Sequence, residues 1–399
     1  MKDYMKGLVT GLVCGILSVS AGIYIGLRTS APEGLIFHYP KSGLLSDSGR
    51  AEKLGYIEKI VDTGFLYDID PDDLADGMYA GLMAGLKDPY SRYYTADEYE
   101  EETTVSEGNY SGVGIVMTMN AEGSVDITRV YEGSPAERAG ILAGDVITAV
   151  DGLPVKGLTL SDVAGLIRNT GKDSAEFTIQ RGEETLSYTV AIERVEIPAV
   201  TGQMLDESGT GYIRISEFTG VAPDQYEKIM ASLKEQGLQK LIVDLRDNPG
   251  GYVTSVCDIL RKILPEGVIF YTEDKNGNRT EETCDGKNEL GLPLCVLVNE
   301  NSASASEIFA GAVKDYGTGT LVGTTTFGKG VVQSIIGLND GSAVKLTISE
   351  YFTPDGNKIH EIGITPDVVC EAGEEGFPET PDPEKDPQLL RAMEILDET

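Results

Sequence analysis

Residues 240–251 read Lys-Leu-Ile-Val-Asp-Leu-Arg-Asp-Asn-Pro-Gly-Gly, and this stretch decides the fold. Its continuous apolar run is typical of a strand buried on both faces of a parallel sheet. The paired glycines predict a loop whose backbone N–H groups point into a cleft, although a plain strand-to-helix loop fits equally well. Helices are predicted at 223–236 and 252–264, and a second buried strand at 294–298. The chain beyond residue 205 is therefore predicted to be an α/β domain.

A small-residue run with three serines follows the second buried strand. It reads Asn-Ser-Ala-Ser-Ala-Ser-Glu at 301–307 and predicts the start of a helix. A serine at the positive end of a helix has backbone N–H groups nearby that can bind an oxyanion. Serines at a helix start are more often simple caps, however. These residues alone do not choose among Ser302, Ser304 and Ser306.

A lysine between two glycines, Lys329, comes next, and Gln333 lies four residues beyond it. The chain has only 2 His, so a nucleophilic serine here would be served by a lysine base. Such a base must be largely uncharged, which requires the lysine pKa to fall by about three units. The competing interpretation of Lys329 is a surface lysine on a turn. That of Gln333 is an ordinary polar residue of a strand.

Composition sets limits on the partners. The 399 residues suggest two or three domains, and 41% hydrophobic with 24% charged residues indicates a globular protein. The net charge of −33 makes nucleic acid and anionic lipid head groups poor partners for the body of the protein. Cys284 and Cys295 could pair, but inert thiols are the favoured interpretation. No close-set Cys/His pattern exists, so no metal is predicted, and no cofactor is expected.

The N-terminus predicts export. Gly7 to Leu27 contains no charged residue, which is long enough to cross a bilayer, and Lys2 and Lys6 precede it. Those lysines keep the N-terminal end in the cytoplasm, so residues 1–28 are predicted to be an uncleaved signal anchor with the rest outside. A cleaved signal peptide, with secretion, is the alternative.

Two further segments precede the α/β domain. In the helical segment, Asp70 is predicted to cap a helix whose stripe Leu74, Met78, Leu82 and Leu86 packs in a core. Residues 105–195 alternate short β-rich runs with glycine turns around one helix at about 160–169, which is typical of a small binding module.

The glycine loop of this module is the candidate peptide site. Gly112, Val113, Gly114 and Ile115 lead into a strand, and their N–H groups could hold a terminal carboxylate while the peptide adds a strand alongside. The glycine spacing is weak evidence by itself. The helix that follows is correctly placed to form one wall of a groove.

Taken together, these segments resemble the carboxyl-terminal processing peptidases, or tail-specific serine proteases with a PDZ domain. The resemblance runs from about residue 55 to the end. It rests on Leu86–Ser91, Gly112–Ile115, Ser134–Ala136, Asp244–Gly251, Ser302–Gly311, Thr326–Gln333, Tyr351–Gly356, Gly363–Asp367 and Asp386–Leu389.

The resemblance implies roles for individual residues. The family's dyad serine lies 25 residues before its lysine, which is the separation of Ser304 and Lys329, and the supporting glutamine falls on Gln333. The implied oxyanion donors are the N–H groups of Ala305 and of Gly250 or Gly251.

Arg168 resembles the arginine that couples peptide capture to activation in this family. An exposed cation at a helix end is the competing interpretation. His360 and Glu361 depart from the polar residues common in relatives, and so does Lys87, which stands where leucine is common. None of the three touches the proposed chemistry.

The prediction is a membrane-anchored serine endopeptidase acting outside the cytoplasm on proteins with exposed apolar C-terminal ends. A homodimer is allowed. The fold class is α/β in several domains, with a crotonase- or ClpP-like core. The predicted parts are the anchor 1–28, a stalk 29–50, a helical segment 51–104, a PDZ domain 105–195, a protease core 196–370, and an acidic linker with a C-terminal helix 371–399. The alternatives are a non-catalytic PDZ adaptor and an acyl-transferring enzyme on a crotonase-like core.

Overall fold

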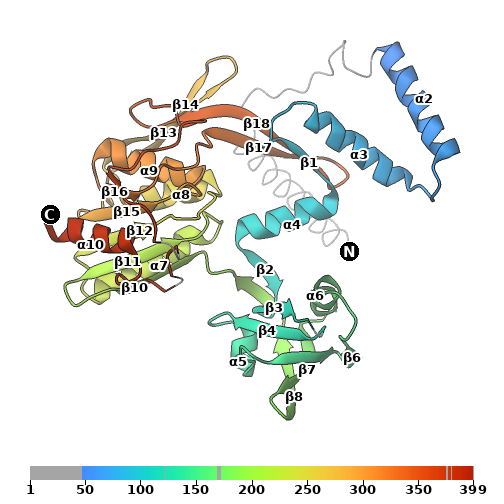
Figure 1. Cartoon of the computed structure of the whole chain (residues 1–399), viewed down its shortest axis with the longest axis horizontal. Coiled ribbons are helices and arrows are strands. Elements are labelled where there is room, and N and C mark those ends of the chain that lie inside the picture. Colours follow the sequence, from blue (N-terminus) through green and yellow to red (C-terminus); the bar gives the residue numbers. More distant parts are fainter. Residues whose placement is uncertain (1–46, 122, 169–171, 374–375, 379, 399) are drawn as a thin grey trace, which may run out of the picture. The chain divides into compact units, whose positions relative to one another are not determined.

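The computed structural model describes residues 47–121, 123–168, 172–373, 376–378 and 380–398. The predicted anchor and most of the predicted stalk lie outside the described residues. Within these ranges, none of the helices has both the length and the apolar character that crossing a bilayer requires. The chain divides into two compact units, whose elements are labelled in Figure 1.

The first unit joins the described residues up to Glu100 with Val332–Ser349. Its elements are α2 (Ser48–Gly64), α3 (Pro71–Ala84), β1 (Arg92–Tyr94), and the parts of α4 (Ala96–Glu107), β17 (Val331–Gly337) and β18 (Ala343–Phe352) within those ranges. β1 pairs antiparallel with β18, with Arg92 opposite Lys345. Residues 332–349 therefore group with β1, whereas the division based on the sequence placed them in the protease core.

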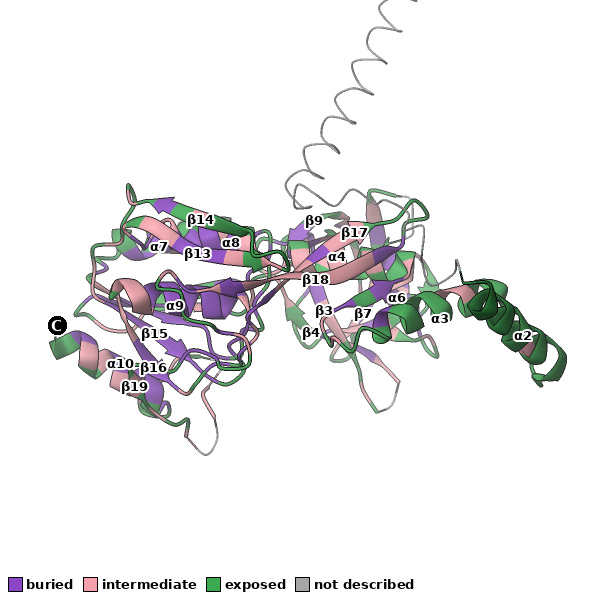
Figure 2. Ribbon diagram, turned by 90° about the horizontal axis from the view of Figure 1, so that it is seen from above, coloured by how far each residue is buried: buried purple, intermediate pink, exposed green. Residues whose placement is uncertain are grey.

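The helix α3 starts as predicted but does not pack as predicted. The Asp70 side chain accepts a hydrogen bond from the N–H of Asp72, and Pro71 occupies the first turn. The predicted core stripe is wrong, because Leu74, Met78, Leu82 and Leu86 are 42–58% exposed. Helical periodicity predicts an apolar face but does not supply a surface to cover it. In the described residues α3 buries only Met83, and α2 buries none. Figure 2 shows α2 almost entirely in the colour of exposed residues.

The second unit, Glu101–Val331 with Glu350–Thr399, contains a small β module. Its sheet has the order β3-β4-β5-β7-β8, with β6 beside β5. The elements are β3 (Ile115–Met119), β4 (Val125–Val130), α5 (Pro135–Ala139), β5 (Val146–Val150), β6 (Leu153–Pro154), α6 (Leu160–Arg168), β7 (Ser174–Arg181) and β8 (Glu184–Ala191). Alternate strand residues such as Ile147, Phe177 and Ile179 form a core with Val163 and Ile167 of α6.

A short two-stranded ladder borders this module. β2 (Asn109–Gly112) pairs antiparallel with β9 (Glu193–Glu196), so Tyr110 lies opposite Val195. The two ends of the module are thereby held together. The predicted glycine loop begins within β2 and continues into β3.

The rest of the second unit is the predicted α/β domain. Its six-stranded sheet has the order β10-β11-β12-β15-β16-β19, antiparallel between β10 and β11 and parallel elsewhere. The strands are β10 (Val200–Met204), β11 (Thr210–Ile215), β12 (Lys240–Asp244), β15 (Leu294–Val298), β16 (Thr320–Gly323) and β19 (Val368–Val369). The helices are α7 (Ala222–Glu235), α8 (Val253–Leu260), α9 (Ala305–Tyr316) and α10 (Pro387–Glu398).

Helices cover both faces of this sheet, as the continuous apolar strands predicted. On one face Tyr212, Ile242 and Leu297 pack against Leu389 and Ala392 of α10. A side chain at Gly211, the neighbour of Tyr212 in β11, would instead point at Leu233 of α7. Since β12 and β15 are parallel, the loops after them leave the sheet at the same edge.

The sequence did not predict the hairpin of β13 (Glu266–Asp274) and β14 (Arg279–Asp285). In the second unit, the last residues of β18 pack on it through aromatic rings. Tyr351 contacts Phe270 edge-on, and Phe352 stacks on Tyr271. This packing buries Tyr351 beside the loops that carry the candidate active site.

Candidate active site

Ser304 lies at the sharp turn between β15 and α9. Its φ is +55°, a conformation that residues other than glycine rarely adopt. Its backbone N–H donates to Glu307 Oε2 over 2.9 Å, which ties the turn to the first turn of α9. Strain of this kind persists only when its surroundings impose it, and it concentrates at functional sites.

Burial and hydrogen bonding distinguish the three candidate serines. The Ser302 hydroxyl donates to Leu245 O over 2.8 Å, and the Ser306 hydroxyl donates to Asn248 O over 3.0 Å. Both of these side chains are completely buried, whereas Ser304 is only partly buried. Ser302 and Ser306 therefore fasten the turn to the glycine loop, and Ser304 is the serine that a substrate can reach.

The glycine loop after β12 is fitted against Ser304. A Cβ atom at Gly250 would lie 2.8 Å from Ser304 Cβ and 3.0 Å from Ala305 N, so only glycine fits there. The Asn248 side chain shapes the loop by accepting from Gly250 N over 2.8 Å and donating to Ile215 O.

The proposed oxyanion donors differ in their hydrogen bonding. The Gly250 N–H is occupied by Asn248. The N–H groups of Ala305 and Gly251 have no acceptor within the described ranges, so they are the pair available to an oxyanion.

Glu307 joins the serine turn to the lysine loop. Its carboxylate is fully buried, and Oε2 also accepts from the backbone N–H of Lys329 over 2.8 Å. Oε1 accepts from Gly328 N over 2.6 Å and from the Thr326 hydroxyl over 2.7 Å. Burial raises the pKa of the Glu307 carboxyl above its ordinary value, against the opposing effect of these hydrogen bonds.

Tyr351 makes the same connection on the carbonyl side. Its hydroxyl lies 2.9 Å from Ser304 O and 2.5 Å from Lys329 O and shares its single proton between them. The backbones of Ser304 and Lys329 are thus bridged twice, by two buried side chains. Neither bridging residue was predicted from the sequence, although the Glu three positions after Ser304 carries a capping-box signal.

Gln333 lies on β17, within the first unit. Its side-chain amide donates to the Thr347 hydroxyl over 3.2 Å. The implied support of the lysine by Gln333 stays a prediction.

A buried arginine anchors the glycine loop to the end of the chain. Arg246 is 1% exposed and donates to Asp244 over 2.6 Å, to Asp386 over 2.8 Å and to Gln388 over 2.9 Å. Because Asp386 and Gln388 lie at the start of α10, this ion pair fixes the C-terminal helix to the strand that precedes the loop. Burial opposes the charge of Arg246, but the carboxylates of Asp244 and Asp386 outweigh it and raise the pKa of Arg246 above its ordinary value.

The glycine loop of the β module is closely packed at Gly114. Gly114 has a φ of +86°, and a Cβ there would lie 2.2 Å from Ser134 Cβ. The Val113 and Gly114 carbonyls both accept backbone hydrogen bonds: Ala136 N donates to Val113 O, and Tyr131 N donates to Gly114 O. Arg168 ends α6 and is exposed. This position fits both the coupling role and the competing interpretation as an exposed cation at a helix end.

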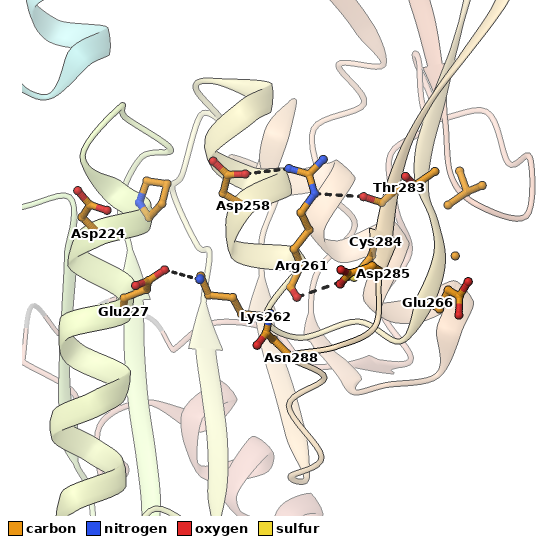
Figure 3. A pocket seen from close by; sticks show the side chains of 13 residues that line it. Asp224, Glu227, Asp258, Arg261, Lys262, Glu266, Thr283, Cys284, Asp285 and Asn288 are labelled. Atoms are coloured by element: carbon orange, nitrogen blue, oxygen red, sulfur yellow. Dashed lines mark hydrogen bonds and ion pairs between the residues drawn. The ribbon is translucent and has the colours of Figure 1, made fainter.

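A polar cavity of 910 Å³ lies elsewhere in the second unit, between α7, the end of α8 and the β13–β14 hairpin. Figure 3 shows Arg261 donating to Asp258 and to Thr283 O, and Lys262 paired with Glu227. None of the candidate catalytic residues lines this cavity.

The described cysteines are all free. Cys257, Cys284 and Cys295 are buried, and Cys370 is partly exposed. Cys284 and Cys295 are therefore not paired with each other, and both are buried. No cluster of His, Cys, Asp or Glu suited to a metal occurs among the residues that the structure describes.

Comparison with known proteins identifies two family models in the chain. Peptidase family S41 matches residues 209–370, and a PDZ domain matches residues 127–181. The carboxyl-terminal-processing protease of Synechocystis sp. is 37% identical over 322 residues, covering 79% of this chain and 75% of that protein.

Two other proteins are similar over more of the chain. The probable CtpA-like serine protease of Staphylococcus aureus strain COL is 32% identical over 365 residues, covering 91% of this chain and 71% of that protein. A solved structure from Bacteroides fragilis, assigned to the S41 proteases, superposes with a TM-score of 0.50 at 15% identity. The superposition covers 86% of this chain and 97% of the Bacteroides fragilis chain, and it supports the fold alone.

Proposed function

This chain belongs to the carboxyl-terminal-processing serine proteases of peptidase family S41, with a PDZ domain, and we propose that it cleaves proteins with a dyad of Ser304 and Lys329. The observation that carries the proposal is the double bridge between these residues through Glu307 and Tyr351. Two distant segments are thereby fixed beside each other at the edge of the sheet where parallel strands end.

The proposed chemistry begins with a neutral Lys329 amine. The amine takes the proton of the Ser304 hydroxyl as the oxygen attacks the peptide carbonyl, and the N–H groups of Ala305 and Gly251 bind the oxyanion that forms. The ammonium of Lys329 then protonates the leaving amine as the C–N bond breaks. Water attacks the acyl-enzyme after giving its proton to Lys329, which returns it to Ser304. Gln333 is proposed to orient the lysine.

Substrate selection is proposed to occur at the PDZ domain. Its loop of Gly112, Val113, Gly114 and Ile115 would hold the terminal carboxylate of a substrate protein whose last residues are apolar. Arg168, at the end of α6, is proposed to couple this capture to activation. The fixed backbone of the loop and the exposed position of Arg168 support both roles.

The proposed location is outside the cytoplasm, on a single N-terminal membrane anchor. Its support is the uncharged stretch from Gly7 to Leu27 with Lys2 and Lys6 before it. Digestion of intact cells by an added protease tests this, because an exported body is degraded while a cytoplasmic one survives. A homodimer remains an expectation that sedimentation can check.

The catalytic proposal is tested with the purified full-length chain and an unfolded protein that ends in apolar residues. Ser304→Ala and Lys329→Ala should each lower cleavage by at least about 1,000-fold. Lys358→Ala is the matched lysine control, because that side chain is paired with Glu350 at the surface, and it should cleave normally. Cleavage that survives Lys329→Ala would refute the dyad.

A further inference from the structure

The glycine loop after β12 is held in place by the backbone of Phe218. The Phe218 N–H donates to Gly250 O over 2.7 Å, and the Tyr252 N–H donates to Phe218 O over 2.7 Å. Phe218 thus pairs with Gly251 as residues of two adjacent parallel strands do. An added Cβ at Gly251 would lie 2.4 Å from Phe218 O, so this pairing requires a glycine at 251.

The first of these hydrogen bonds sets the direction of a proposed oxyanion donor. The Gly250 carbonyl and the Gly251 N–H belong to one planar trans peptide unit, so they point in opposite directions. Holding the oxygen on Phe218 therefore turns the N–H away from Phe218. Glycines on both sides, with φ values of +112° and +131°, would otherwise let this unit rotate as a whole. The Phe218 N–H opposes that rotation.

The side chain of Phe218 is anchored to the helix that carries the serine turn. The ring is fully buried, and its centroid lies 6.3 Å from that of Phe309 in α9. Since α9 begins directly after Ser304, the same helix positions the proposed nucleophile and the residue that orients the Gly251 N–H.

The two residues after Phe218 rest on the chain that enters the PDZ domain. The Gly220 N–H donates to Ser106 O over 3.0 Å. Gly108 has a φ of +71°, and an added Cβ there would lie 2.5 Å from Thr219 Oγ1 and 2.7 Å from Thr219 Cβ. Thr219 is only 4% exposed, so it has little room to move aside. Residues 106–108, here called the PDZ stem, therefore hold this segment in place.

We propose that Phe218 is a positioning residue for the oxyanion hole and that the PDZ stem fixes its backbone, so that the Gly251 N–H faces the reacting carbonyl. This inference rests on the proposed function of Ser304. It makes the PDZ stem part of the framework of the active site. A displaced stem weakens the binding of the oxyanion and leaves the Lys329 amine as it was. Because the oxyanion forms only in the reaction, the loss falls on kcat and not on KM.

The test uses the full-length chain and p-nitrophenyl butyrate, a short ester with no chain end for the PDZ loop to bind. Gly108→Ala places a methyl group against Thr219. It should lower kcat for this ester about 10- to 100-fold with KM unchanged, somewhat less than the loss of a whole oxyanion donor. Gly152→Ala is the matched control, because that glycine has a φ of +75° and open space in its Cβ direction, and it should keep the parent kcat. An unchanged kcat with Gly108→Ala overturns the inference.

A second variant presses on the same contact more gently and without strain from a positive φ. An added Cβ at Gly220 would lie 3.1 Å from Glu107 O, so Gly220→Ala must push the PDZ stem and the Phe218 segment slightly apart. It should lower kcat about threefold to tenfold. Gly165→Ala, in α6 with open space in its Cβ direction, is its control and should have no effect. If Gly108→Ala does not fold, Gly220→Ala decides alone, and a kcat equal to that of the control rejects the inference.

Two readouts distinguish a displaced oxyanion donor from general damage to the site. The pH midpoint of kcat/KM, which the Lys329 amine sets, should be the same in Gly108→Ala as in the parent chain. The amides of Phe218 and Tyr252 should exchange hydrogen faster in this variant, whereas the Lys329 amide should not. A shifted midpoint, or unchanged exchange at Phe218, would show that the PDZ stem does not act through this residue.

The same ester separates this inference from the proposed function. Ser304→Ala and Lys329→Ala should each abolish its hydrolysis. If either variant hydrolyses the ester at the parent rate, the proposed dyad fails and the inference fails with it. If both variants are inactive while Gly108→Ala and Gly220→Ala keep the parent kcat, the dyad stands and the inference alone is wrong.

Discussion

The backbone N–H groups of Ser304 and Lys329 donate to the same atom, Glu307 Oε2, over 2.9 and 2.8 Å. The backbones of the two residues proposed to exchange a proton are thus positioned by one buried carboxylate. Glu307 is a positioning residue. Its four donors come from two segments, one from the serine turn and three from the lysine loop at 326–329, so the carboxylate can stay in place only if both segments are correctly arranged.

Replacing Glu307 by glutamine keeps the shape of this side chain but turns one acceptor into a donor. An amide NH₂ would then face backbone N–H groups instead of accepting from them, at about 1–3 kcal/mol for each donor left unsatisfied. Glu307→Gln should lower kcat roughly 10- to 100-fold with little change in KM. Glu300→Gln, an exposed carboxylate before the same turn, is the control and should be neutral. A fall confined to KM would argue against a positioning role.

The contact between Gly250 and Ser304 predicts that a single methyl group damages the site. An alanine at 250 would lie 2.8 Å from Ser304 Cβ at a φ of +112°, so either the loop or the serine must move. Gly250→Ala should therefore reduce cleavage by about 100-fold or more. Gly317→Ala is the matched control, because that glycine has a φ of +63° and open space around its Cβ direction. It should cost about 1 kcal/mol of stability and retain activity.

The ion pair of Arg246 with Asp386 predicts that the end of the chain is needed for the active site. Asp386→Asn removes one of the two carboxylates that neutralise the buried guanidinium of Arg246, which should lower the free energy of unfolding by about 3–5 kcal/mol. Amides of α10 should then exchange much faster, and cleavage should fall. Asp397→Asn on the same helix removes the surface pair with Lys240 and should cost no more than about 1 kcal/mol. Unchanged exchange in α10 after Asp386→Asn would contradict this account.

Acid should weaken the PDZ domain through Asp145. Hydrogen bonding to Arg181 holds the pKa of this buried carboxyl below its ordinary value. A folded-state pKa below the unfolded one gives stability that is present above the unfolded value, about 3.9, and is lost as the pH falls through the folded value.

Asp145→Asn tests this directly. At pH 7 it should lower the protection of β7 amides against hydrogen exchange by roughly 1–3 kcal/mol, discounted because Arg181 is partly exposed. The difference from the parent chain should narrow as the pH drops below about 4. Glu183→Gln, an exposed carboxyl of the same domain, should change nothing. A difference that is constant with pH would exclude the ion pair as its cause.

The sequence predicted the parts of the fold that local pattern controls. The apolar run at 240–245 became the central strand β12, and the helix predicted at about 160–169 became α6, because periodicity and caps are local properties. The exposed stripe on α3 shows the limit of such patterns, since periodicity does not reveal what packs against a face. In the β13–β14 hairpin, β14 is polar and mostly exposed and so gives no strand signal, whereas β13 carries an apolar run with a buried centre that the prediction overlooked.

The candidate site likewise contains residues that the sequence predicts and a residue that it does not. Ser304, Lys329 and the glycine loop carry local signals, and the family resemblance chose among the three serines, which the hydroxyl contacts now distinguish. Tyr351 carries no local signal. It reaches the site because β18 brings it there from 47 residues beyond Ser304. Contacts that span such distances depend on topology, and one sequence does not specify them.

The most direct test of the dyad is the rate at which a fluorophosphonate labels Ser304, located by peptide mass spectrometry. Only a serine with a base beside it reacts quickly with this reagent. The account predicts that the reagent labels Ser304 alone and that Lys329→Ala lowers the labelling rate by at least about 100-fold, while Lys358→Ala does not. Labelling of another serine, or an equal rate at Ser304 without the Lys329 amine, would contradict it.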